Sequence, residues 1–538
     1  MRKIIIFALI TLFFVEANSQ SRRRIIQRLK KYRPTYVAPV IQVGDTIING
    51  VYFIDIANSG ITQGIVTDTV AYDNRSIMNA KILLAKSLGA DTISFTGKLD
   101  AYFNVKAWHF GNYTHREAIQ IPSNTYFKMH DSITLRVQPN NRISYAILSA
   151  RGVSNVKISG GHLIGDKYAH TYATGTPQDT HEFGTGIYFV GVDGGEIDGV
   201  TIDDMTGDCF GVHATRNRNP DGSEVVGQFY SKNILIKNVT FRGARRNNLS
   251  FIDVDGLTLE NSIIANAGEG GDIPNYGTVY DWRGVLPRCN IDLEATRSFD
   301  ASGNIKLSQI VTNIIIRNNA FTNAWISDIN LYTCDSLQIY GNTFTSGISN
   351  LNAQNVYIHD NTFTHDPTLT ALPIAIYMKE FVRQGTGLEE NINYQIYNNT
   401  IEGFETGIAV GGNNHDIYNN TINNATVNGI LLRKGKNINW TNNTVNANGI
   451  TNKGIYVFPV LKDLENVTIS GGSYDGVTYG ADIYKINGKG PTGFTIDGTT
   501  FLNTLYIRSS DSITVKNSIY PLPLVQSNNG KITLTNNQ

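Results

Sequence analysis

From about residue 145 onward, short segments that end in an Asn-rich turn recur along the sequence, and this repeat constrains the fold more than any other feature. The recurring segments include "LQIYGNTFTSG", "YQIYNNTIEG" and "HDIYNNTINN", and their turn Asn stands at positions 319, 342, 361, 399, 420 and 443. Most steps are about 20 to 23 residues; one step of 38 allows two coils, or one coil with an inserted loop. Such a period with alternating apolar residues is typical of a solenoid.

Each repeat reads as a strand, a turn and another strand, which selects among the known solenoids. Leucine-rich repeats need a helix and recurring Leu at fixed offsets, and propellers need a longer period. We therefore predict an all-β parallel β-helix with coils of three short strands and an apolar interior. At one corner, we expect each Asn to hydrogen-bond the Asn of the next coil. This ladder explains the many N-x-T triplets better than glycosylation does.

Composition agrees with this fold and excludes several kinds of function. The 51 Gly residues and the abundant Asn favour turns and strands over helices. Lys plus Arg (45) balance Asp plus Glu (45), which argues against a nucleic-acid or membrane-surface partner. The three cysteines, Cys209, Cys289 and Cys334, are an odd number without zinc-site spacing, so we predict neither a disulfide scaffold nor a zinc site.

The first 19 residues read as a signal peptide, with a basic start, an apolar run over 4–15 and small residues at 17–19. The apolar run is too short to span a bilayer, and no Cys follows it for lipid attachment. We predict a secreted or periplasmic monomer without a membrane span. A lead-in with the first strands would occupy 20–72, and the β-helix domain 73–538.

One amphipathic helix is predicted over 74–90, in "NRSIMNAKILLAKSLGA". Its expected apolar face follows helical spacing and consists of Ile77, Ala80, Leu83, Leu84, Ala85 and Leu88. Gly89 is the expected stop, since glycine commonly ends helices in the left-handed conformation.

The candidate site comes from five segments that we expect to stack in successive coils: "GIYFV" (186–190), "DCFGV" (208–212), "NLSFI" (248–252), "NIDLE" (290–294) and "DINLY" (328–332). Strand residues alternate between faces, so Asp292 and Glu294 should share the outer face. The alignment predicts three outward columns: Tyr188, Phe210, Ser250, Asp292 and Asn330; Val190, Val212, Ile252, Glu294 and Tyr332; and Asp208, Asn248, Asn290 and Asp328. With coils about 4.8 Å apart, the columns form one acidic patch.

Long insertions flank the same strands, at 166–185, 213–230, 268–288 and 295–309. Long loops in a compact solenoid are usually functional, so we predict that they wall a groove around residues 166–332. Aromatic rings stack on sugars and arginines pair with uronate or sulfate groups, which predicts a polysaccharide substrate. The predicted substrate-binding residues are Tyr188, His181, His213, Arg245, Arg246, Asn248, Trp282, Arg297, Asn330 and Tyr332, and the loops add Tyr172, Phe183, Tyr276 and Tyr280.

Asp292 and Glu294 are the predicted catalytic pair. Positions i and i+2 separate their carboxyls by roughly 6–7 Å, between the values of retaining and inverting glycosidases, so both outcomes stay open. Asp208, expected roughly 10 Å away, could complete an acid/base pair. Alternatively, the two acids form a solvated face paired with Arg288 or Arg297, and Asp208 stabilises a turn.

The repeats and the opening "NAKILLAKSLGADTISFTGKLDAYF" resemble the pectate-lyase-like right-handed parallel β-helix proteins over roughly residues 75–535. The resemblance implies a right-handed coil and carbohydrate chemistry without fixing a subfamily. Polygalacturonases carry "DD" before a Cys and "GHG", whereas this chain has only "GDC" (207–209). Mannuronan epimerases carry "FDPHE"; "CFGVHA" (209–214) keeps Phe210 and His213 but has Gly211 in place of the Asp.

Calcium-dependent pectate lyases, also in this superfamily, combine clustered acids with a basic proton abstractor. By this resemblance Ca²⁺ could be held by Asp208, Asp292, Glu294 and Asp328, and the base would be Arg245, Arg246 or Arg297.

Three functions follow. We favour a glycoside hydrolase that requires no cofactor or metal, in which Asp292 or Glu294 protonates the leaving oxygen and Asp208 activates water or attacks the sugar. The second is a uronate lyase or C5-epimerase assisted by Ca²⁺ or Arg. The third is a non-catalytic carbohydrate-binding or adhesive solenoid. The clustered acids favour an enzyme over a binder.

Overall fold

The computed structural model describes residues 44–538, with gaps at 106–117, 173–180, 216–229, 270–281, 296, 300–304, 308, 369–372, 380, 383–387, 390, 450–451, 459–463, 485–491, 509–512, 522–524 and 528–531. The predicted signal peptide therefore lies outside the described residues.

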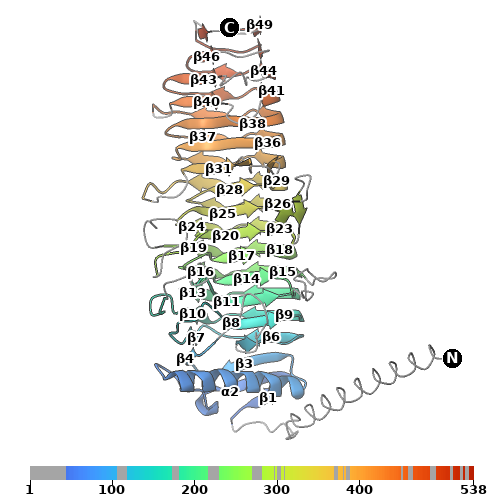
Figure 1. Ribbon diagram of the computed structural model, residues 1–538, viewed down its shortest axis with the longest axis vertical. Coiled ribbons are helices and arrows are strands. Elements are labelled where there is room, and N and C mark those ends of the chain that lie inside the picture. The colour runs from blue at the N-terminus through green and yellow to red at the C-terminus, as the bar shows by residue number, and fades with distance from the viewer. Residues whose placement is uncertain are drawn as a thin grey trace, which may run out of the picture. The chain divides into compact units, whose positions relative to one another are not determined.

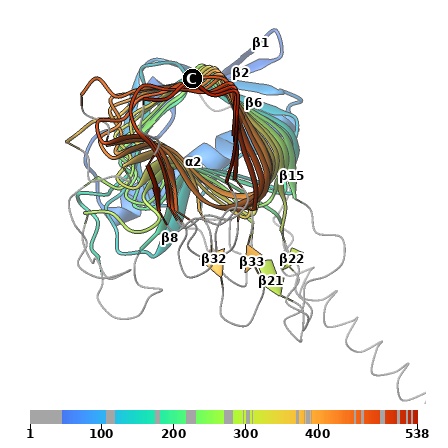
Figure 2. The same ribbon diagram turned by 90° about the horizontal axis from the view of Figure 1, so that it is seen from above.

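Three parallel ladders of short strands wind around one axis, as the views from the side and from above show (Figures 1 and 2). The first ladder consists of β5 (Ile119–Gln120), β8 (Ser144–Arg151), β11 (Phe183–Val190), β14 (Phe210–His213), β17 (Leu249–Phe251), β20 (Cys289–Glu294), β25 (Ser327–Tyr332), β28 (Ile348–Leu351), β31 (Ile374–Met378), β36 (Thr406–Tyr418), β38 (Asn428–Thr441), β40 (Lys453–Val457), β43 (Tyr479–Tyr484), β46 (Leu505–Arg508) and β48 (Val525–Ser527).

The second ladder consists of β2 (Val51–Asp55), β3 (Thr92–Thr96), β6 (Thr125–Lys128), β9 (Ser154–Ser159), β12 (Asp193–Asp198), β15 (Ser231–Lys237), β18 (Val254–Glu260), β23 (Val311–Arg317), β26 (Asp335–Tyr340), β29 (Gln354–His359), β34 (Ile392–Tyr397), β41 (Leu464–Ser470), β44 (Thr492–Asp497), β47 (Ile513–Lys516) and β49 (Ile532–Thr535). Strands β36 and β38 also pair within this ladder, because each runs around the corner as one long strand.

The third ladder consists of β4 (Leu99–Phe103), β7 (Ile133–Val137), β10 (His162–Ile164), β13 (Thr201–Asp203), β16 (Thr240–Arg242), β19 (Ile263–Ala265), β24 (Ala320–Thr322), β27 (Thr343–Phe344), β30 (Thr362–Thr364), β35 (Thr400–Glu402), β37 (Thr421–Asn423), β39 (Thr444–Asn446), β42 (Ser473–Tyr474) and β45 (Thr500–Phe501). Strand β1 (Thr46–Ile48) pairs antiparallel with β2. Outside the ladders lie the 3-10 helix η1 (Ile56–Asn58) and the hairpins β21 (Arg297–Phe299)–β22 (Ile305–Leu307) and β32 (Phe381–Val382)–β33 (Leu388–Glu389).

The interior of the coils is one continuous apolar core that runs from Tyr52 to Tyr520. It follows from the alternation within each strand, since every second side chain points inward. In β20, for example, Ile291 and Leu293 are fully buried, as predicted. The predicted parallel β-helix is confirmed.

The amphipathic helix α2 (Asp68–Ser87) begins six residues earlier than predicted, and its buried face differs from the predicted one. Thr67 caps its start by accepting a hydrogen bond from the Val70 N–H, and Gly89 follows its end at a φ of +79°. The residues that are buried are Ala71, Asn74, Arg75, Met78, Lys81, Ile82 and Ala85.

The predicted face is confirmed in part: Ala85 is buried, and Ile77, Leu84 and Leu88 pack against the core. Leu83 is 65% exposed, however, and three of the buried positions are polar. Lys81, for instance, forms a fully buried ion pair with Asp45 at 2.6 Å. A pattern search for apolar residues cannot detect a helix face of this kind. Among the described helices, none is both long and apolar enough to cross a membrane.

The predicted Asn corner is confirmed between the second and third ladders. Asn399 Nδ2 donates to Asn420 Oδ1 (2.9 Å) and to the Ile358 carbonyl (2.9 Å), and its backbone N–H donates to the same Asn420 oxygen. The same bonds link positions 319, 342, 361, 399, 420 and 443 in order. The preceding residue, such as Asn398 at φ +55°, makes the left-handed turn. The first Asn of the recurring "NNT" thus makes the turn, and the second forms the hydrogen bonds between coils.

Strand pairing in the first ladder differs from the prediction at β14 by one residue. Tyr188 lies beside Gly211 instead of Phe210, and Phe210 pairs with Ile187. Phe210 is fully buried, with its ring centroid 5.3 Å from that of Phe189. Burying the aromatic ring and leaving glycine at the outer position is the more favourable choice, and a one-residue shift exchanges the two faces.

The other two predicted columns also change. In the second column Val212 is fully buried, and His213 takes its place beside Val190. In the third column Asp208 does not join Asn248; it accepts a hydrogen bond from the Asn247 N–H (3.1 Å) instead. The rest of that column was wrongly predicted to point outward, since Asn248, Asn290 and Asp328 are fully buried.

Candidate functional site

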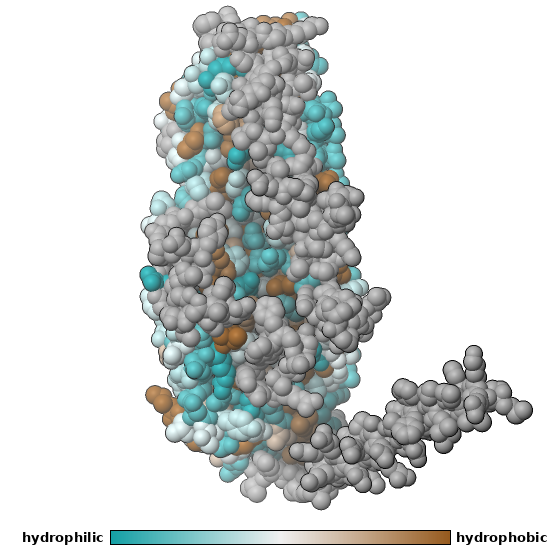
Figure 3. All heavy atoms as spheres, in the orientation of Figure 1, coloured by the Kyte–Doolittle hydropathy of each residue, from teal (hydrophilic) through white to brown (hydrophobic). Residues whose placement is uncertain are grey.

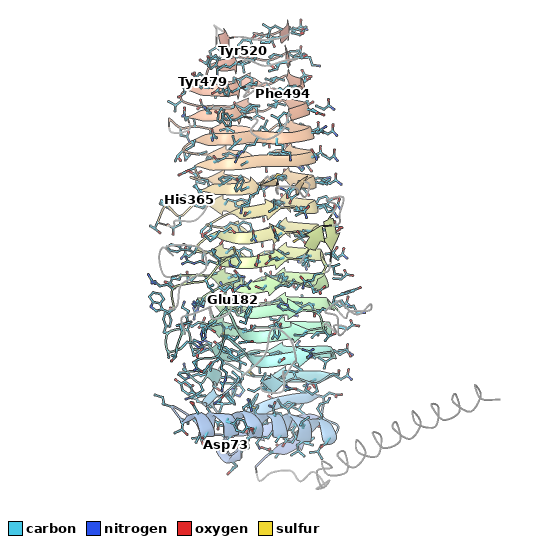
Figure 4. All side chains as sticks on the ribbon, viewed as in Figure 1. Asp73, Glu182, His365, Tyr479, Phe494 and Tyr520 are labelled. Carbon is cyan, nitrogen blue, oxygen red and sulfur yellow. The ribbon has the colours of Figure 1, made fainter. Side chains whose placement is uncertain are left out.

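Three carboxylates gather around the guanidinium of Arg246 on the first ladder. Arg246 Nη1 lies 3.0 Å from Asp208 Oδ2, Nε lies 3.7 Å from Glu182 Oε2, and Nη2 lies 3.9 Å from Asp292 Oδ2. Glu182 directly precedes β11, Asp208 precedes β14, Arg246 precedes β17 and Asp292 lies within β20. Consecutive coils therefore each supply one charged group (Figure 4 labels Glu182).

Asn247 and Ser250 hold this charged cluster in place. Asn247 donates its backbone N–H to Asp208 Oδ1 (3.1 Å) and its amide to Asp292 Oδ2 (3.5 Å) and to the Ser250 hydroxyl (3.1 Å). The Ser250 oxygen also accepts from Arg246 Nη1 (3.2 Å). Both residues are fully buried. The sequence analysis missed Asn247; its position after "RR" and two residues before a strand was the available signal.

Asp292 is fully buried, and its environment favours the neutral acid. Burial and the neighbouring Glu294 raise the pKa of Asp292 to about 7, against the opposing effects of Arg246 and of Asn330. Asn330 donates its amide to Asp292 Oδ1 at 2.8 Å. The Asp292 carboxyl is thus able to give or take a proton near neutral pH.

The other charged groups have more fixed roles. Burial raises the pKa of Asp208, and the adjacent Arg246 opposes that rise. For Arg246, burial lowers the pKa, but the surrounding carboxylates, Asp208 first, raise it above the ordinary arginine value. Arg246 therefore keeps its proton and is a poor candidate for the base of a lyase. Arg288, a predicted partner of the two acids, donates instead to the Gly268 carbonyl.

The predicted substrate-binding residues Tyr188, His213 and Tyr332 lie on strands of the first ladder at or beside this cluster, whereas Trp282 lies in a loop. Tyr332 pairs in register with Glu294, and both are half-buried. The ring of Tyr188 is 5.0 Å from that of His213. Trp282 is 41% exposed and lies 5.6 Å from the ring of Tyr168, measured between centroids.

Arg245, Asn248 and His181 do not reach a surface, which revises their predicted role. Asn248 is fully buried and donates its amide to Asn290 Oδ1 (2.8 Å) and to the Ala265 carbonyl (2.7 Å). Arg245, also fully buried, stacks 4.5 Å from the centre of the Tyr172 ring. These residues support the site from within.

His181 belongs to a buried chain that the sequence analysis did not find. Its Nδ1 lies 2.8 Å from His170 Nε2, and His170 Nδ1 lies 2.7 Å from Asp166 Oδ2. The Tyr145 hydroxyl donates to the other oxygen of Asp166 (2.8 Å). Since His181 directly precedes Glu182, this chain fixes the backbone that presents Glu182 to Arg246.

The Ca²⁺ site implied by the lyase resemblance does not fit the described side chains. Asp328 Oδ2 accepts the N–H groups of Thr345 (2.9 Å) and Ser346 (2.7 Å), and Oδ1 accepts the Asn290 amide, which places Asp328 in a turn. The guanidinium of Arg246 already lies between Asp208 and Asp292, where a cation would have to bind. Among the described residues, no group of three or more His, Cys, Asp or Glu side chains is arranged so that it could hold a metal ion.

Parts of the predicted groove lie outside the described residues, which include neither Tyr276 and Tyr280 nor the side chain of Arg297. The groove itself stays a prediction. Figure 3 shows that the described surface of this face mixes hydrophilic and hydrophobic residues.

Comparison with known proteins identifies the superfamily. The sequence model of the "right handed beta helix region" matches residues 225–371 and 308–459. The chain is a right-handed parallel β-helix protein. A curated relative of this β-helix protein is YclG of Bacillus subtilis (strain 168), 29% identical over 370 residues, which cover 66% of this chain and 59% of YclG. The chain thus spans less than two thirds of that relative.

Two solved structures share the fold of this β-helix protein. The tailspike protein of E. coli bacteriophage HK620, solved as a mutant in complex with a pentasaccharide, has a TM-score of 0.52 at 11% identity, covering 86% of this chain and 77% of the tailspike. The bacteriophage phi29 gene product 12 has a TM-score of 0.50 at 12% identity, covering 90% of this chain and 72% of gene product 12. At these identities the likeness concerns the fold.

Proposed function

We propose that this β-helix protein is a glycoside hydrolase that cleaves a polysaccharide with the carboxyl groups of Asp292 and Glu294. The observation that carries the proposal is the buried carboxyl of Asp292, which lies two residues from Glu294 on the same face of β20. Burial and Glu294 raise the pKa of its carboxyl to about 7, and general acids of glycosidases have raised pKa values of this kind. Asp292 would protonate the leaving oxygen as the glycosidic bond breaks.

Glu294 is the second carboxylate of the proposed mechanism. It lies two residues further along β20, on the same face as Asp292, and is half-buried where Asp292 is fully buried. It would activate a water molecule or attack the sugar directly; the two routes differ in the stereochemistry of the product. Asp208 holds the charge and position of Arg246 and does not react in this mechanism.

Two observations support a hydrolase over a uronate lyase. A lyase needs a base that removes the C5 proton, and the carboxylates around Arg246 raise its pKa and keep it protonated. It also needs a cation at the uronate carboxylate, and the described acids lack a geometry that would hold Ca²⁺. The HK620 tailspike, which shares the fold, was solved with a bound oligosaccharide.

The test is a screen of the purified protein against plant, algal and host polysaccharides, read both for new reducing ends and for the absorbance of unsaturated uronates. Reducing ends without that absorbance, lost in Asp292→Asn, are the expected result. Reducing ends together with the absorbance would establish a lyase, and binding without cleavage would leave a carbohydrate-binding solenoid. The predicted signal peptide agrees with a substrate outside the cytoplasm.

A further inference from the structure

The outer face of the first ladder changes character towards the C-terminus. On β40, β43 and β46, and at the residue directly after β40, the outward positions carry aromatic and basic side chains, which we call the C-terminal patch: Lys453, Tyr456, Phe458, Tyr484, Tyr506 and Arg508. All six are half-buried, so part of each side chain reaches the surface. Tyr479, labelled in Figure 4, adds a further ring 5.3 Å from that of Tyr506.

One buried acidic residue, Asp482, contacts both cations of the patch. Asp482 is fully buried, and its carboxylate accepts two hydrogen bonds from Arg508 Nη2 (2.6 and 2.8 Å) and lies 3.1 Å from Lys453 Nζ. Lys453, Asp482 and Arg508 are the charged residues of these three strands. Within these three described strands, the two cations therefore outnumber the single carboxylate.

The rings hold the cations in fixed positions. Lys453 Nζ lies 3.3 Å from the centre of the Tyr456 ring, and the guanidinium carbon of Arg508 lies 4.5 Å from that of Tyr484 and 4.8 Å from that of Tyr506. Cations fixed in this way lose little entropy when they bind an anion. The rings beside them offer the apolar faces on which sugars stack.

The aromatic rings of the second ladder differ from those of the C-terminal patch in their interplanar angles. On the second ladder the rings of Tyr397 and Tyr418 lie parallel at 4.8 Å with an interplanar angle of 2°. In the C-terminal patch the Tyr456 and Phe458 rings are tilted by 33°, and those of Tyr479 and Tyr506 by 34°. The Phe458 and Tyr484 rings, by contrast, are nearly parallel (13°) with centroids 5.9 Å apart. The patch therefore combines one stacked pair with tilted rings, and cations lie against several of its rings.

The patch lies on the same ladder as the candidate active site. Strand pairing places Asp292, Asn330, Ser349, Tyr377, Ala409, Leu431, Tyr456 and Asp482 in one outward column. Seven steps of about 4.8 Å separate Asp292 from Asp482 by roughly 34 Å. A polysaccharide chain lying along this ladder would contact both places.

We propose that the C-terminal patch is a second binding site, for a polysaccharide that carries carboxylate or sulfate groups. The proposal rests on the proposed function in that it names the class of polymer that the candidate active site would cleave. Carboxylate or sulfate groups of such a polymer can form ion pairs with Lys453 and Arg508, whereas neutral glycans cannot.

The experiment measures binding in the Asp292→Asn background, so that cleavage does not intervene. Calorimetric titration uses polygalacturonate and alginate as carboxylated probes, chondroitin sulfate as a sulfated probe and dextran as a neutral one. The variants are Tyr484→Ala with Tyr506→Ala, and Lys453→Gln, which leaves Arg508 on Asp482. The matched control is Tyr397→Ala with Tyr418→Ala on the second ladder. Thermal melts check that each variant folds.

At least one anionic probe is expected to bind more tightly than dextran, with an affinity that falls as salt rises. Loss of the two patch rings should weaken this binding by about tenfold or more, as for rings that dominate a contact, and the control pair should bind like the parent. The proposal is overturned if the patch variants bind like the parent, if the control pair loses as much, or if none of the anionic probes binds better than dextran. If binding depends on the patch but the parent cleaves nothing, the proposed function fails while the binding site stands.

Discussion

Asp292 and Asp482 lie in the same outward column of the first ladder, seven coils apart, but the charges around the two carboxylates differ. Among the described side chains, Asp292 shares the cation Arg246 with Asp208 and Glu182, and Glu294 adds further negative charge beside it. Asp482 has two cations of its own, Arg508 and Lys453. The repeat thus fixes where a carboxylate stands, whereas the charges of adjacent coils decide whether it exchanges protons or only binds cations.

Substituting the two central acids should abolish turnover without unfolding the protein. Asp292→Asn and Glu294→Gln preserve size, so the fold should persist, while loss of a general acid or base lowers kcat by roughly 10² to 10⁴. Activated aryl glycosides barely need protonation, so they should rescue the variant of the acid, which we expect to be Asp292→Asn. Asp416→Asn, at an exposed position of the second ladder, is the matched control. If both acid variants keep nearly full turnover, Asp208, His213 and Glu182 become the next candidates.

The pH dependence of hydrolysis should report on Asp292. A general acid must carry its proton, so kcat/KM should fall as the pH rises through the pKa of about 7. Because Arg246 lowers that pKa, Arg246→Gln should move the alkaline limb to higher pH. Arg242→Gln, which removes an arginine bound to Asp203 on the third ladder, should leave the limb in place. An unshifted limb in Arg246→Gln would mean that another group controls it.

Protein stability should also depend on Asp292. Its folded-state pKa of about 7 lies above the ordinary value of an unfolded Asp. The folded protein therefore holds the proton more tightly, and the contribution of this residue to stability falls as the pH rises from about 4 to about 7. Asp292→Asn removes this titratable group. The melting temperature of the variant minus that of the parent should therefore be larger at pH 8 than at pH 5. Equal differences at the two pH values would contradict the assigned pKa.

The Asn corner should matter for stability and not for catalysis. Asn399→Leu or Asn420→Leu removes the amide bonds to the adjacent coils, at a cost of about 1–3 kcal/mol in the free energy of unfolding. Both lie at the corner between the second and third ladders, away from the acids of the first, so activity per folded molecule should persist. Asn439→Leu, at an exposed position of β38, is the control and should cost little. A stable but inactive Asn420→Leu protein would place the active site in the wrong coils.

The fold was predictable from the sequence because one period and one recurring turn residue specify it. The site was predictable only in part, since its acids were found through strand alternation in β20, which the apolar Ile291 and Leu293 define. Arg246 was found as a charge near these strands, but its central position depends on a turn whose path no periodicity describes.

The errors have specific physical causes. Phe210 was assigned to the outer face because the aligned segments were matched by length, whereas burial of its ring decides the register. Asn248 was assigned outward by the same alternation, although it precedes the strand and its amide reaches the third ladder. The chain from Asp166 through His170 to His181 joins two parts of one long loop, and such contacts leave no periodic signal in the sequence.

The uniformity of the Asn corner has a cost during folding. Because each Asn offers the next coil the same donors and acceptor, a chain paired one whole coil out of step would satisfy the corner almost equally well. The buried polar row of Asn248, Asn290 and Asp328 is different, because its members are not identical. Asn290 accepts a hydrogen bond from the amide of Asn248 and donates one to the carboxylate of Asp328. A skipped coil would leave such groups unsatisfied in the interior. This row therefore specifies which coils lie next to each other. It disfavours misfolded forms with shifted coil pairing, which the repeats alone would permit.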